Sequence, residues 1–215
     1  MNERIPLVYV VDDEGCVRRA LTRLIQSAGY RVDAYGSARE FLAGMRANPH
    51  AAPSPACAVL DVQMPDLSGL ELQRELDACL PVIFVTGHGD IAMTVGAIKA
   101  GAADFLTKPV HDADLLRAIE LALARSIETS QQRRELDELR TRLERLTPRE
   151  REVMDLVVMG RLNKQVACEL GTVEKTVKAH RARVMQKMEV NSLAELVRVA
   201  DKVALAGVAR KQIPQ

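Results

Sequence analysis

Residues 57–61, Cys-Ala-Val-Leu-Asp, decide the fold of the N-terminal half, because four apolar residues end abruptly in an aspartate. Such a run is too short for a helix and is typical of a strand that is buried on both faces. Two further runs have the same form: Leu7–Val11, which precedes Asp12, and Val82–Val85, which precedes Thr86. Weaker strand patterns cover 32–35 and 103–106. The sequence therefore predicts five strands.

Helical patterns separate these strands. In the first of them the apolar residues lie three or four positions apart, at Val17, Leu21, Leu24, Ile25 and Ala28. Strands that alternate with helices predict a parallel sheet with helices on both faces. The size matches a flavodoxin-like, doubly wound α/β domain, which we assign to residues 1–125. Residues 47–56 contain three prolines and are predicted to form a loop.

The composition of the 215-residue chain is that of a globular protein, with 47% hydrophobic and 27% charged residues. No apolar run approaches the length of a membrane span, and the N-terminus lacks the features of a secretory signal. The four cysteines lie far apart without a CxxC pair, which argues against a zinc site or a disulfide framework. They fit a reducing compartment, so we expect a cytoplasmic protein with no membrane partner.

The charge is distributed unevenly along the chain. Residues 1–125 carry 12 basic and 16 acidic side chains, a net charge of −4. Residues 126–215 carry 18 basic and 13 acidic side chains, a net charge of +5. An acidic first half and a basic second half indicate different partners for the two halves.

The stretch 126–145 is polar and charged and is predicted to be a linker helix. Its leucines at 136, 139 and 143, followed by Leu146, are spaced by three and four residues. We interpret them as one core-facing stripe, because a dimeric coiled coil usually needs three or four heptads. A short dimerising seam is the alternative.

Residues 146–208 are predicted to form an all-α domain. Thr147-Pro-Arg-Glu150 has the pattern of a capped helix start, and Gly160 is expected to end that helix. Asn163 is then expected to cap a short helix that ends at Gly171. A longer basic helix follows from about 173 to 188, and a last helix begins after Ser192.

Polar residues gather where the predicted strands of the first half end. In a doubly wound sheet, ligands bind beyond the carboxyl ends of the strands. The residues there are Asp12, Asp13, Asp61, Thr86 and, shortly after the fifth strand, Lys108. Three carboxylates at one edge repel one another, so we expect a cation, and Mg²⁺ fits because it takes oxygen ligands. Asp61 is the candidate nucleophile for an acyl phosphate, with Lys108 and Thr86 contacting the phosphoryl group.

Four motifs in residues 5–125 resemble the receiver domain of response regulators. They are Val11-Asp-Asp13, Leu60-Asp-Val-Gln-Met-Pro-Asp66 with Gly69, Val85-Thr-Gly87 and Phe105-Leu-Thr-Lys-Pro109. The resemblance implies that Asp61 takes a phosphoryl group from a phosphohistidine on a sensor histidine kinase. It also implies that Asp13, Asp61 and the Gln63 carbonyl bind Mg²⁺, with Asp12 acting through water.

The same resemblance implies a conformational switch. Thr86 would move toward the phosphoryl group and Phe105 would turn inward; ordinary core packing is the alternative for Phe105. The altered surface would be the fourth helix, about 91–100, and the fifth strand, so phosphorylation is expected to promote a homodimer there. The peptide bond between Lys108 and Pro109 would be cis.

Residues 163–183 fit a helix, a turn that contains Gly171 and a second helix. Apolar residues of both helices are predicted to face inward: Val166, Ala167, Leu170, Val177, Val184 and Met188. The basic residues of the second helix remain for the outside: Lys175, Lys178, Arg181, Arg183 and Lys187. Such a face can neutralise phosphates and lie in the major groove of DNA, whereas an amphipathic helix in a protein-binding bundle is the alternative.

Residues 146–153, 163–167 and 176–180 resemble the LuxR/FixJ-type output domain, over about 143–205. By that resemblance Lys178, Ala179 and Ala182 approach base edges. Phosphates would mostly be held by Lys175, Thr176, Arg181, Arg183 and Lys187. Together the two resemblances imply a DNA-binding transcriptional response regulator that binds double-stranded promoter DNA, with RNA polymerase as a further candidate partner.

Two positions depart from the family patterns. The chain reaches the fourth strand at Pro81 with almost no loop, so we expect a shifted third helix and an intact site. Val173 stands where the family usually has a Ser or similar cap, so capping is expected to fall to Thr172. An aspartyl-phosphate phosphatase or phosphotransferase is the alternative function, but Gln63 replaces the second carboxylate of such enzymes, and no cap-sized insertion is present.

Overall fold

The structure is a computed structural model that describes residues 5–47, 55–76, 79–87 and 91–211. It divides into two compact units, residues 1–131 and 132–215.

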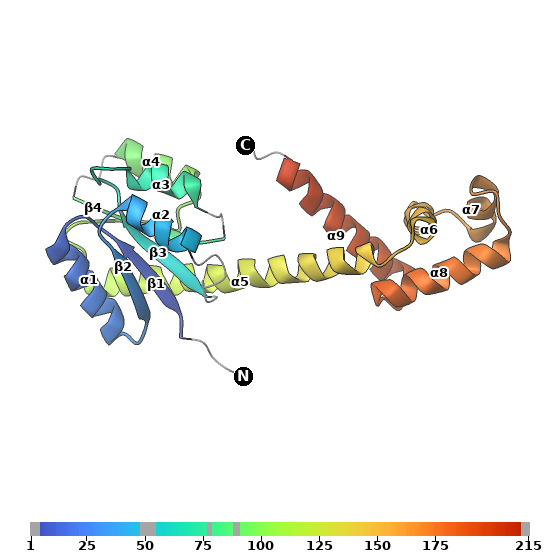
Figure 1. The fold of residues 1–215 in the computed structure, drawn as a ribbon, viewed down its shortest axis with the longest axis horizontal. Coiled ribbons are helices and arrows are strands. Elements are labelled where there is room, and N and C mark those ends of the chain that lie inside the picture. Colours follow the sequence, from blue (N-terminus) through green and yellow to red (C-terminus); the bar gives the residue numbers. More distant parts are fainter. Residues whose placement is uncertain (1–4, 48–54, 77–78, 88–90, 212–215) are drawn as a thin grey trace. The chain divides into compact units, whose positions relative to one another are not determined.

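The first unit contains a five-stranded parallel sheet (Figure 1). Its strands are β1 (Leu7–Val11), β2 (Arg31–Tyr35), β3 (Ala56–Asp61), β4 (Val82–Thr86) and β5 (Asp104–Thr107). The spatial order is β2-β1-β3-β4-β5, the order of a flavodoxin-like doubly wound sheet. The predicted fold class is confirmed.

Alternation along the strands builds a hydrophobic core on each face of the sheet. Leu7, Tyr9 and Val11 point to one face, whereas Val8 and Val10 point to the other. The first face is covered by α2 (Ala38–Ala47), α3 (Gly69–Glu75) and α4 (Ile91–Lys99). The second face is covered by α1 (Gly15–Ser27) and the first turns of α5 (Asp112–Glu144). Because β1 is buried on both faces, its sequence is apolar throughout.

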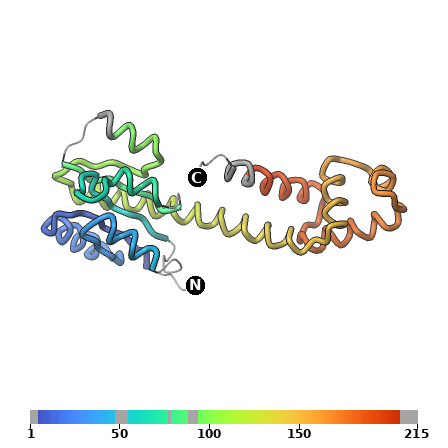
Figure 2. The backbone as a smooth tube through the Cα atoms, turned by 45° about the horizontal axis from the view of Figure 1, so that its top comes forward, coloured from blue at the N-terminus to red at the C-terminus, as the bar shows by residue number. Residues whose placement is uncertain are grey.

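The fifth helix is longer than the sequence suggested. We predicted a linker helix over 126–145, but α5 runs unbroken for 33 residues, as the continuous coil in Figure 2 shows. The polar stretch after residue 125 contains no Pro or Gly that would stop a helix. Ser126, which is buried, accepts a hydrogen bond from the N–H of Ala56 at 3.2 Å, so this part of α5 still belongs to the first unit.

The second unit holds the end of α5 and four further helices: α6 (Pro148–Val158), α7 (Asn163–Glu169), α8 (Glu174–Met188) and α9 (Leu193–Lys211). Leu143 and Leu146 lie in its core and Leu139 is also buried, as predicted, whereas Leu136, the first leucine of the predicted stripe, is partly exposed. Thr147 caps α6 with Pro148 in the first turn and Glu150 at the third position, which confirms the predicted capping box.

Glycines end two of these helices. Gly160 and Gly171 both have positive φ, of 82° and 61°, a conformation that suits glycine best. The short α7 begins one residue away from the expected cap: Leu162 is the N-cap, and its N–H donates to Gln165 Oε1 at 2.9 Å. Asn163 is instead the first helical residue. The predicted loop at 47–56 lies mostly outside the described residues.

Candidate functional site

The register of the sheet places the polar residues of the first unit side by side. Val11 of β1 pairs with Leu60 of β3, so Asp12 and Asp61 follow at the same level on neighbouring strands. Asp61 pairs with Val85 of β4, which puts Thr86 one step beyond. Asp12, Asp61 and Thr86 are all buried, whereas Asp13 is exposed. One edge of the sheet therefore carries the predicted group.

Lys108 lies in the middle of this group. Its ammonium is 2.7 Å from Asp61 Oδ2, 3.0 Å from Asp12 Oδ2 and 3.3 Å from Glu14 Oε1. Burial acts to lower the pKa of Lys108, but its hydrogen bonds to Asp61 and Asp12 outweigh that effect and hold the pKa well above the ordinary value. The ammonium is thus a permanent positive charge between two buried carboxylates. Glu14 did not stand out in the sequence, because an acidic residue before a helix usually reads as a cap.

The carboxylate of Asp12 is strained electrostatically. Burial raises its pKa, and the hydrogen bond with Lys108 offsets this only in part. The nearby Asp61 carboxylate also raises the pKa of Asp12. A second cation at this edge would relieve the remaining repulsion.

The donor set fits Mg²⁺. Carboxylate oxygens of Asp12, Asp13 and Asp61 lie within 4.8 Å of one another. Oxygens on opposite sides of an octahedral Mg²⁺ are about 4.2 Å apart, so a small closure brings three ligands to one ion. Gln63 is exposed, and its N–H donates to Asp61 Oδ1 at 3.0 Å, which orients the carboxylate from the predicted ligand loop.

Neighbouring residues hold this edge in place. A Cβ at Gly69 would lie 2.3 Å from the carbonyl oxygen of Asp61, so only glycine allows the start of α3 to approach β3 this closely. The guanidinium of Arg18 on α1 donates to the carbonyl oxygens of Asp12 and Asp13. Asp66 accepts the N–H of Arg39 at the start of α2, at 3.1 Å. Sequence reasoning did not assign roles to Arg18 or Asp66, since their partners are backbone groups that no motif reveals.

Thr86 and Phe105 lie on the neighbouring strands β4 and β5. Thr86 is completely buried, and its carbonyl oxygen accepts the N–H of Lys108 at 2.7 Å. Phe105 is partly exposed, and its ring centroid lies 6.4 Å from that of Phe84. The peptide bond between Lys108 and Pro109 is cis, as predicted.

In the second unit, α8 presents a polar outer face. Its buried residues are Val177, Val184 and Met188, as predicted. Five of the eight candidate DNA contacts are exposed: Lys175, Lys178, Ala179, Ala182 and Arg183. Thr176, Arg181 and Lys187 are partly buried. The helix-turn-helix geometry is therefore present, with most of the basic side chains outside.

Three of the basic residues already have partners within the unit. Lys178 pairs with Glu174 one turn earlier at 3.1 Å, and Arg181 donates to Asn163 Oδ1 at 3.3 Å. Lys187 donates to the buried carboxylate of Glu150 at 2.6 Å. An exposed pair within one helix opens easily, whereas the bond to Glu150 is shielded. Of these three, Lys187 is thus the least available to DNA.

The prediction that Thr172 caps α8 is wrong. Val173, not Thr172, is the N-cap residue, and it provides no side-chain hydrogen bond. Instead the carbonyl oxygen of Val173 accepts the N–H groups of Thr176 and Val177. The side chain of Thr172 lies one residue too early to reach the first turn.

Two family patterns match the chain. "Response regulator receiver domain" matches residues 8–120, and "Bacterial regulatory proteins, luxR family" matches residues 144–200. The chain belongs to the LuxR-type response regulators.

Named relatives of this response regulator agree with the assignment over nearly its whole length. Nodulation protein W of Bradyrhizobium diazoefficiens is 46% identical over 93% of this chain and 87% of its own length. The transcriptional regulatory protein FixJ of Azorhizobium caulinodans is 44% identical over 97% of this chain and 96% of its own. The response regulator protein TmoT of Ectopseudomonas mendocina is 44% identical over 94% and 91%.

Solved structures of response regulators match as well. The structure of the response regulator StyR has a TM-score of 0.77 and 45% identity, and the match covers 93% of this chain and all of the other. Full-length FixJ from B. japonicum has a TM-score of 0.53 and 38% identity, over 93% of this chain and 97% of the other.

The comparisons support a regulator of transcription with a receiver domain and a LuxR-type DNA-binding domain. They do not favour the alternative, a phosphatase or phosphotransferase, because the named relatives are regulators. Receiver domains act with a sensor kinase and typically bind Mg²⁺, and the acidic cluster of this response regulator is compatible with such an ion. Among the described residues, no helix is both long and apolar enough to cross a bilayer.

The junction before β4 shows how the departure at Pro81 is accommodated. The third helix, α3, has only seven residues and ends at Glu75; residues 77 and 78 lie outside the described residues. Pro81 accepts the N–H of Ala58 through its carbonyl oxygen, and β4 begins at the next residue. This end of the strand is opposite the acidic edge, where the carboxylates and Lys108 still converge.

Proposed function

We propose that Asp61 accepts a phosphoryl group from a phosphohistidine on a sensor histidine kinase, and that this modification controls DNA binding by α8. The observation that carries the proposal is the position of Lys108. Its ammonium bridges Asp12 and Asp61 at the ligand-binding edge of the sheet. A partly buried cation between two buried carboxylates is suited to neutralise an added phosphoryl group at one of them.

The chemistry follows from the residues at this edge. A carboxylate oxygen of Asp61 attacks phosphorus, and the bond between phosphorus and the imidazole nitrogen breaks. The electron pair returns to the imidazole, which leaves neutral when its other nitrogen carries a proton. Mg²⁺ bound by Asp13, Asp61 and the Gln63 carbonyl, with Asp12 acting through water, would neutralise charge on the phosphoryl oxygens. Hydrolysis of the acyl phosphate at the same site returns Asp61 to its starting state.

The switch part of the proposal concerns Thr86 and Phe105. The Thr86 hydroxyl would donate to a phosphoryl oxygen, and Phe105 would turn into the space that Thr86 leaves. The ring of Phe105 is partly buried and packs beside Phe84, with 6.4 Å between the ring centroids. Val95 and Ile98 on α4 are 45% and 48% exposed, which supports a homodimer through α4 and β5.

The DNA part of the proposal concerns the outer face of α8. Lys178, Ala179 and Ala182 would face base edges in the major groove. Lys175, Thr176, Arg181 and Arg183 would hold phosphates, and Lys187 is retained as a weaker candidate. In this proposal the target is double-stranded promoter DNA, and RNA polymerase is a downstream partner. The protein would act on both in the cytoplasm.

Phosphoryl transfer can be tested with acetyl phosphate and Mg²⁺ on the full chain, with intact mass as the readout. Wild type should gain one phosphoryl group, and Asp61→Asn should gain none. Asp33→Asn, which changes an exposed carboxylate on β2, is the matched control and should label like wild type. Equal labelling of Asp61→Asn and wild type would show that the acceptor is elsewhere.

DNA binding can be tested with duplexes selected from a random pool. Lys178→Ala combined with Arg181→Ala should weaken binding, and it should reduce the slope of affinity against salt by about 1, because Arg181 is the proposed phosphate contact of the pair and Lys178 the proposed base contact. Arg151→Ala, which removes an exposed charge from α6, should leave both unchanged. A salt-independent affinity of the wild type would contradict the assignment of α8.

A further inference from the structure

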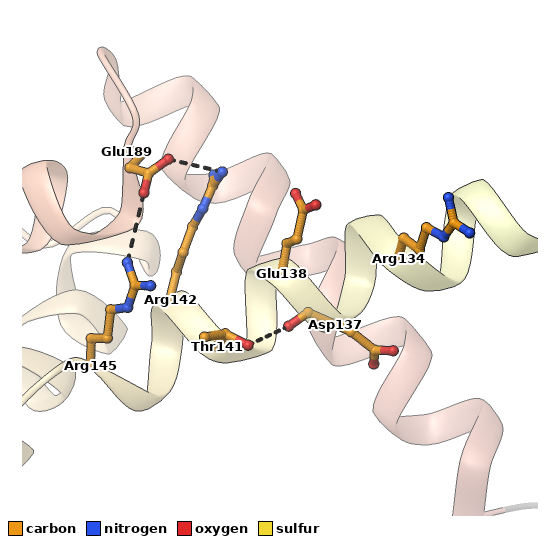
Figure 3. Close-up of a pocket in the computed structure, with 7 residues that line it drawn as sticks. All are labelled: Arg134, Asp137, Glu138, Thr141, Arg142, Arg145 and Glu189. Carbon is orange, nitrogen blue, oxygen red and sulfur yellow. Dashed lines mark hydrogen bonds and ion pairs between the residues drawn. The ribbon is translucent and has the colours of Figure 1, made fainter. Parts of the chain in front are cut away.

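The C-terminal end of α8 is held by the last turns of α5, and both lie in the second unit. Arg142 of α5 donates from Nη2 to Glu189 Oε2 at 2.9 Å, and its Nη1 lies 3.5 Å from the carbonyl oxygen of Met188. Figure 3 shows the Glu189 carboxylate between two guanidiniums, with Arg145 Nη1 3.9 Å from its other oxygen. The end of the proposed recognition helix is thus capped from another helix.

A second contact runs in the opposite direction. Lys187 of α8 donates to the carbonyl oxygen of Arg145, just after α5, at 3.1 Å. The last carbonyl groups of a helix have no partner within it and carry partial negative charge. Each of the two helices therefore sends a cation to the C-terminal end of the other. We call the set Arg142, Arg145, Lys187 and Glu189 the end clamp.

Without its contacts to other side chains, a glutamate at position 189 would destabilise the end of α8. Among the described residues it is the one non-glycine residue with positive φ, at 55°, a conformation for which glycine is the usual choice at a helix end. Its carboxylate also lies at the negative end of the helix dipole. The positive guanidinium groups of Arg142 and Arg145 oppose the second cost, because they lie next to the carboxylate. An outlier that is held by specific partners points to a role for those partners.

The end clamp is not what attaches α5 to the second unit. Leu143 and Leu146 lie in the hydrophobic core of that unit, and burial of their side chains already attaches the end of α5 to it. The groove beside the clamp, of about 460 Å³, is lined by three basic and three acidic residues, so its charge does not favour an ionic ligand. The ion pairs and hydrogen bonds of the clamp depend on direction, so what they can fix is the angle of α8 relative to the end of α5.

We infer that Arg142 and Glu189 are positioning residues that set the direction of α8 from the end of α5, and with it the presentation of the outer face of α8 to DNA. The inference rests on the proposed DNA-binding role of α8. Lys187 also stabilises the second unit itself, because its ammonium donates to both Glu150 and the Arg145 carbonyl.

The test uses the full chain and a duplex that wild type selects from a random pool. Arg142→Met and Glu189→Gly should each weaken DNA binding by about three- to tenfold, the range of coupling expected between residues that share a network. Glycine suits the backbone at 189, so Glu189→Gly should keep or raise the melting temperature of the second unit. A residue with a merely structural role would change stability and DNA affinity together.

Three comparisons sharpen the test. Arg140→Met, which removes an arginine that pairs along α5 with Asp137, should bind DNA like wild type. Arg142→Lys, which keeps a cation beside Glu189 and the Met188 carbonyl, should retain more of the affinity than Arg142→Met. The dependence of affinity on salt should keep its slope in Arg142→Met, because no phosphate contact is removed.

Opposite results would overturn the inference. A slope lowered by about 0.9 would make Arg142 a direct phosphate contact. Wild-type affinity in both Arg142→Met and Glu189→Gly would remove the positioning role. If the proposed function were wrong, the Lys178 and Arg181 variants would bind DNA like wild type. The clamp could still be demonstrated in that case, because Arg142→Met would show faster hydrogen exchange in the last turn of α8 than wild type.

Discussion

Lys108 Nζ lies 2.7 Å from Asp61 Oδ2, the shortest of the three ion pairs that this ammonium makes. In the unmodified protein the lysine therefore occupies the place where positive charge is needed after phosphorylation. The same ammonium competes with Mg²⁺ for the carboxylates of Asp12 and Asp61. Binding of the ion and pairing of the lysine are thus opposed until a phosphoryl group adds negative charge.

This competition predicts that Lys108→Met binds Mg²⁺ more tightly than wild type. Two like charges about 4 Å apart repel by about 1 kcal/mol even in bulk water, so removal of the ammonium should raise the affinity at least about fivefold. Titration calorimetry with MgCl₂ at constant ionic strength measures the effect. Lys99→Met, which changes an exposed lysine at the end of α4, should not alter the affinity. Unchanged or weaker binding in Lys108→Met would mean that the carboxylates do not form the metal site.

The close approach of α3 to β3 predicts that Gly69→Ala damages the acceptor site. The added methyl group meets the carbonyl oxygen of Asp61 at 2.3 Å, and backbone must move to make room. We expect a loss of about 2 kcal/mol in the free energy of unfolding, together with slower labelling by acetyl phosphate. Urea unfolding and intact mass measure the two effects.

Gly96→Ala is the matched control for this prediction. It lies in α4, where an added methyl group meets nothing within 4 Å. The change should raise stability by about 0.5–1 kcal/mol, because alanine favours a helix, and should leave labelling unchanged. If both alanine variants label alike, the tight contact at Gly69 does not position Asp61.

The buried carboxylate of Glu150 predicts a pH-dependent stability of the second unit. Its hydrogen bonds with Lys187 and with the N–H of Thr147 lower its pKa to about 2. A lowered pKa means that this stabilisation is present above the ordinary value of 4.5 and is lost as pH falls from there toward 2. Glu150→Gln should cost about 1–3 kcal/mol at pH 7, and the difference from wild type should shrink below pH 4.5.

Chemical unfolding at pH 7 and pH 3, with hydrogen exchange of α6 and α8, measures this difference. Glu152→Gln serves as the control, since Glu152 is half-exposed and pairs with Arg149 within α6. The free energy of unfolding of Glu152→Gln should differ from that of wild type by no more than about 0.5 kcal/mol at either pH. A constant difference between Glu150→Gln and wild type at both values would refute the assigned pKa.

The parts of the fold that local sequence determines were predictable. Runs such as Leu7–Val11 leave no other solution than a buried parallel strand, and the order of such strands fixes where Asp12, Asp61 and Thr86 meet. The capping box at Thr147 and the stops at Gly160 and Gly171 are also local, because each depends on residues within one turn.

The parts that depend on distant partners were not predictable in the same way. Lys187 and Glu150 are 37 positions apart, and the sequence shows each as one more charged residue on a helix surface. Arg142 and Glu189 likewise meet only through the packing of α5 on α8. The length of α5 was missed because a charged helix that continues past its core looks like a separate linker.

The missing cap of α8 gives a last prediction. Val173 is the N-cap residue, is 64% exposed and supplies no hydrogen bond to the first turn. Val173→Ser should add that bond and stabilise the helix start by about 1 kcal/mol, without loss of buried apolar surface. Since the first turn carries Lys175 and Thr176, two proposed phosphate contacts, affinity for DNA should rise by up to about fivefold. Hydrogen exchange at residues 174–176 and a DNA titration measure both effects.

Thr172→Ala is the control. Because Thr172 does not cap α8, residues 174–176 of this variant should exchange as in wild type. Faster exchange of these residues would mean that Thr172 caps α8 after all.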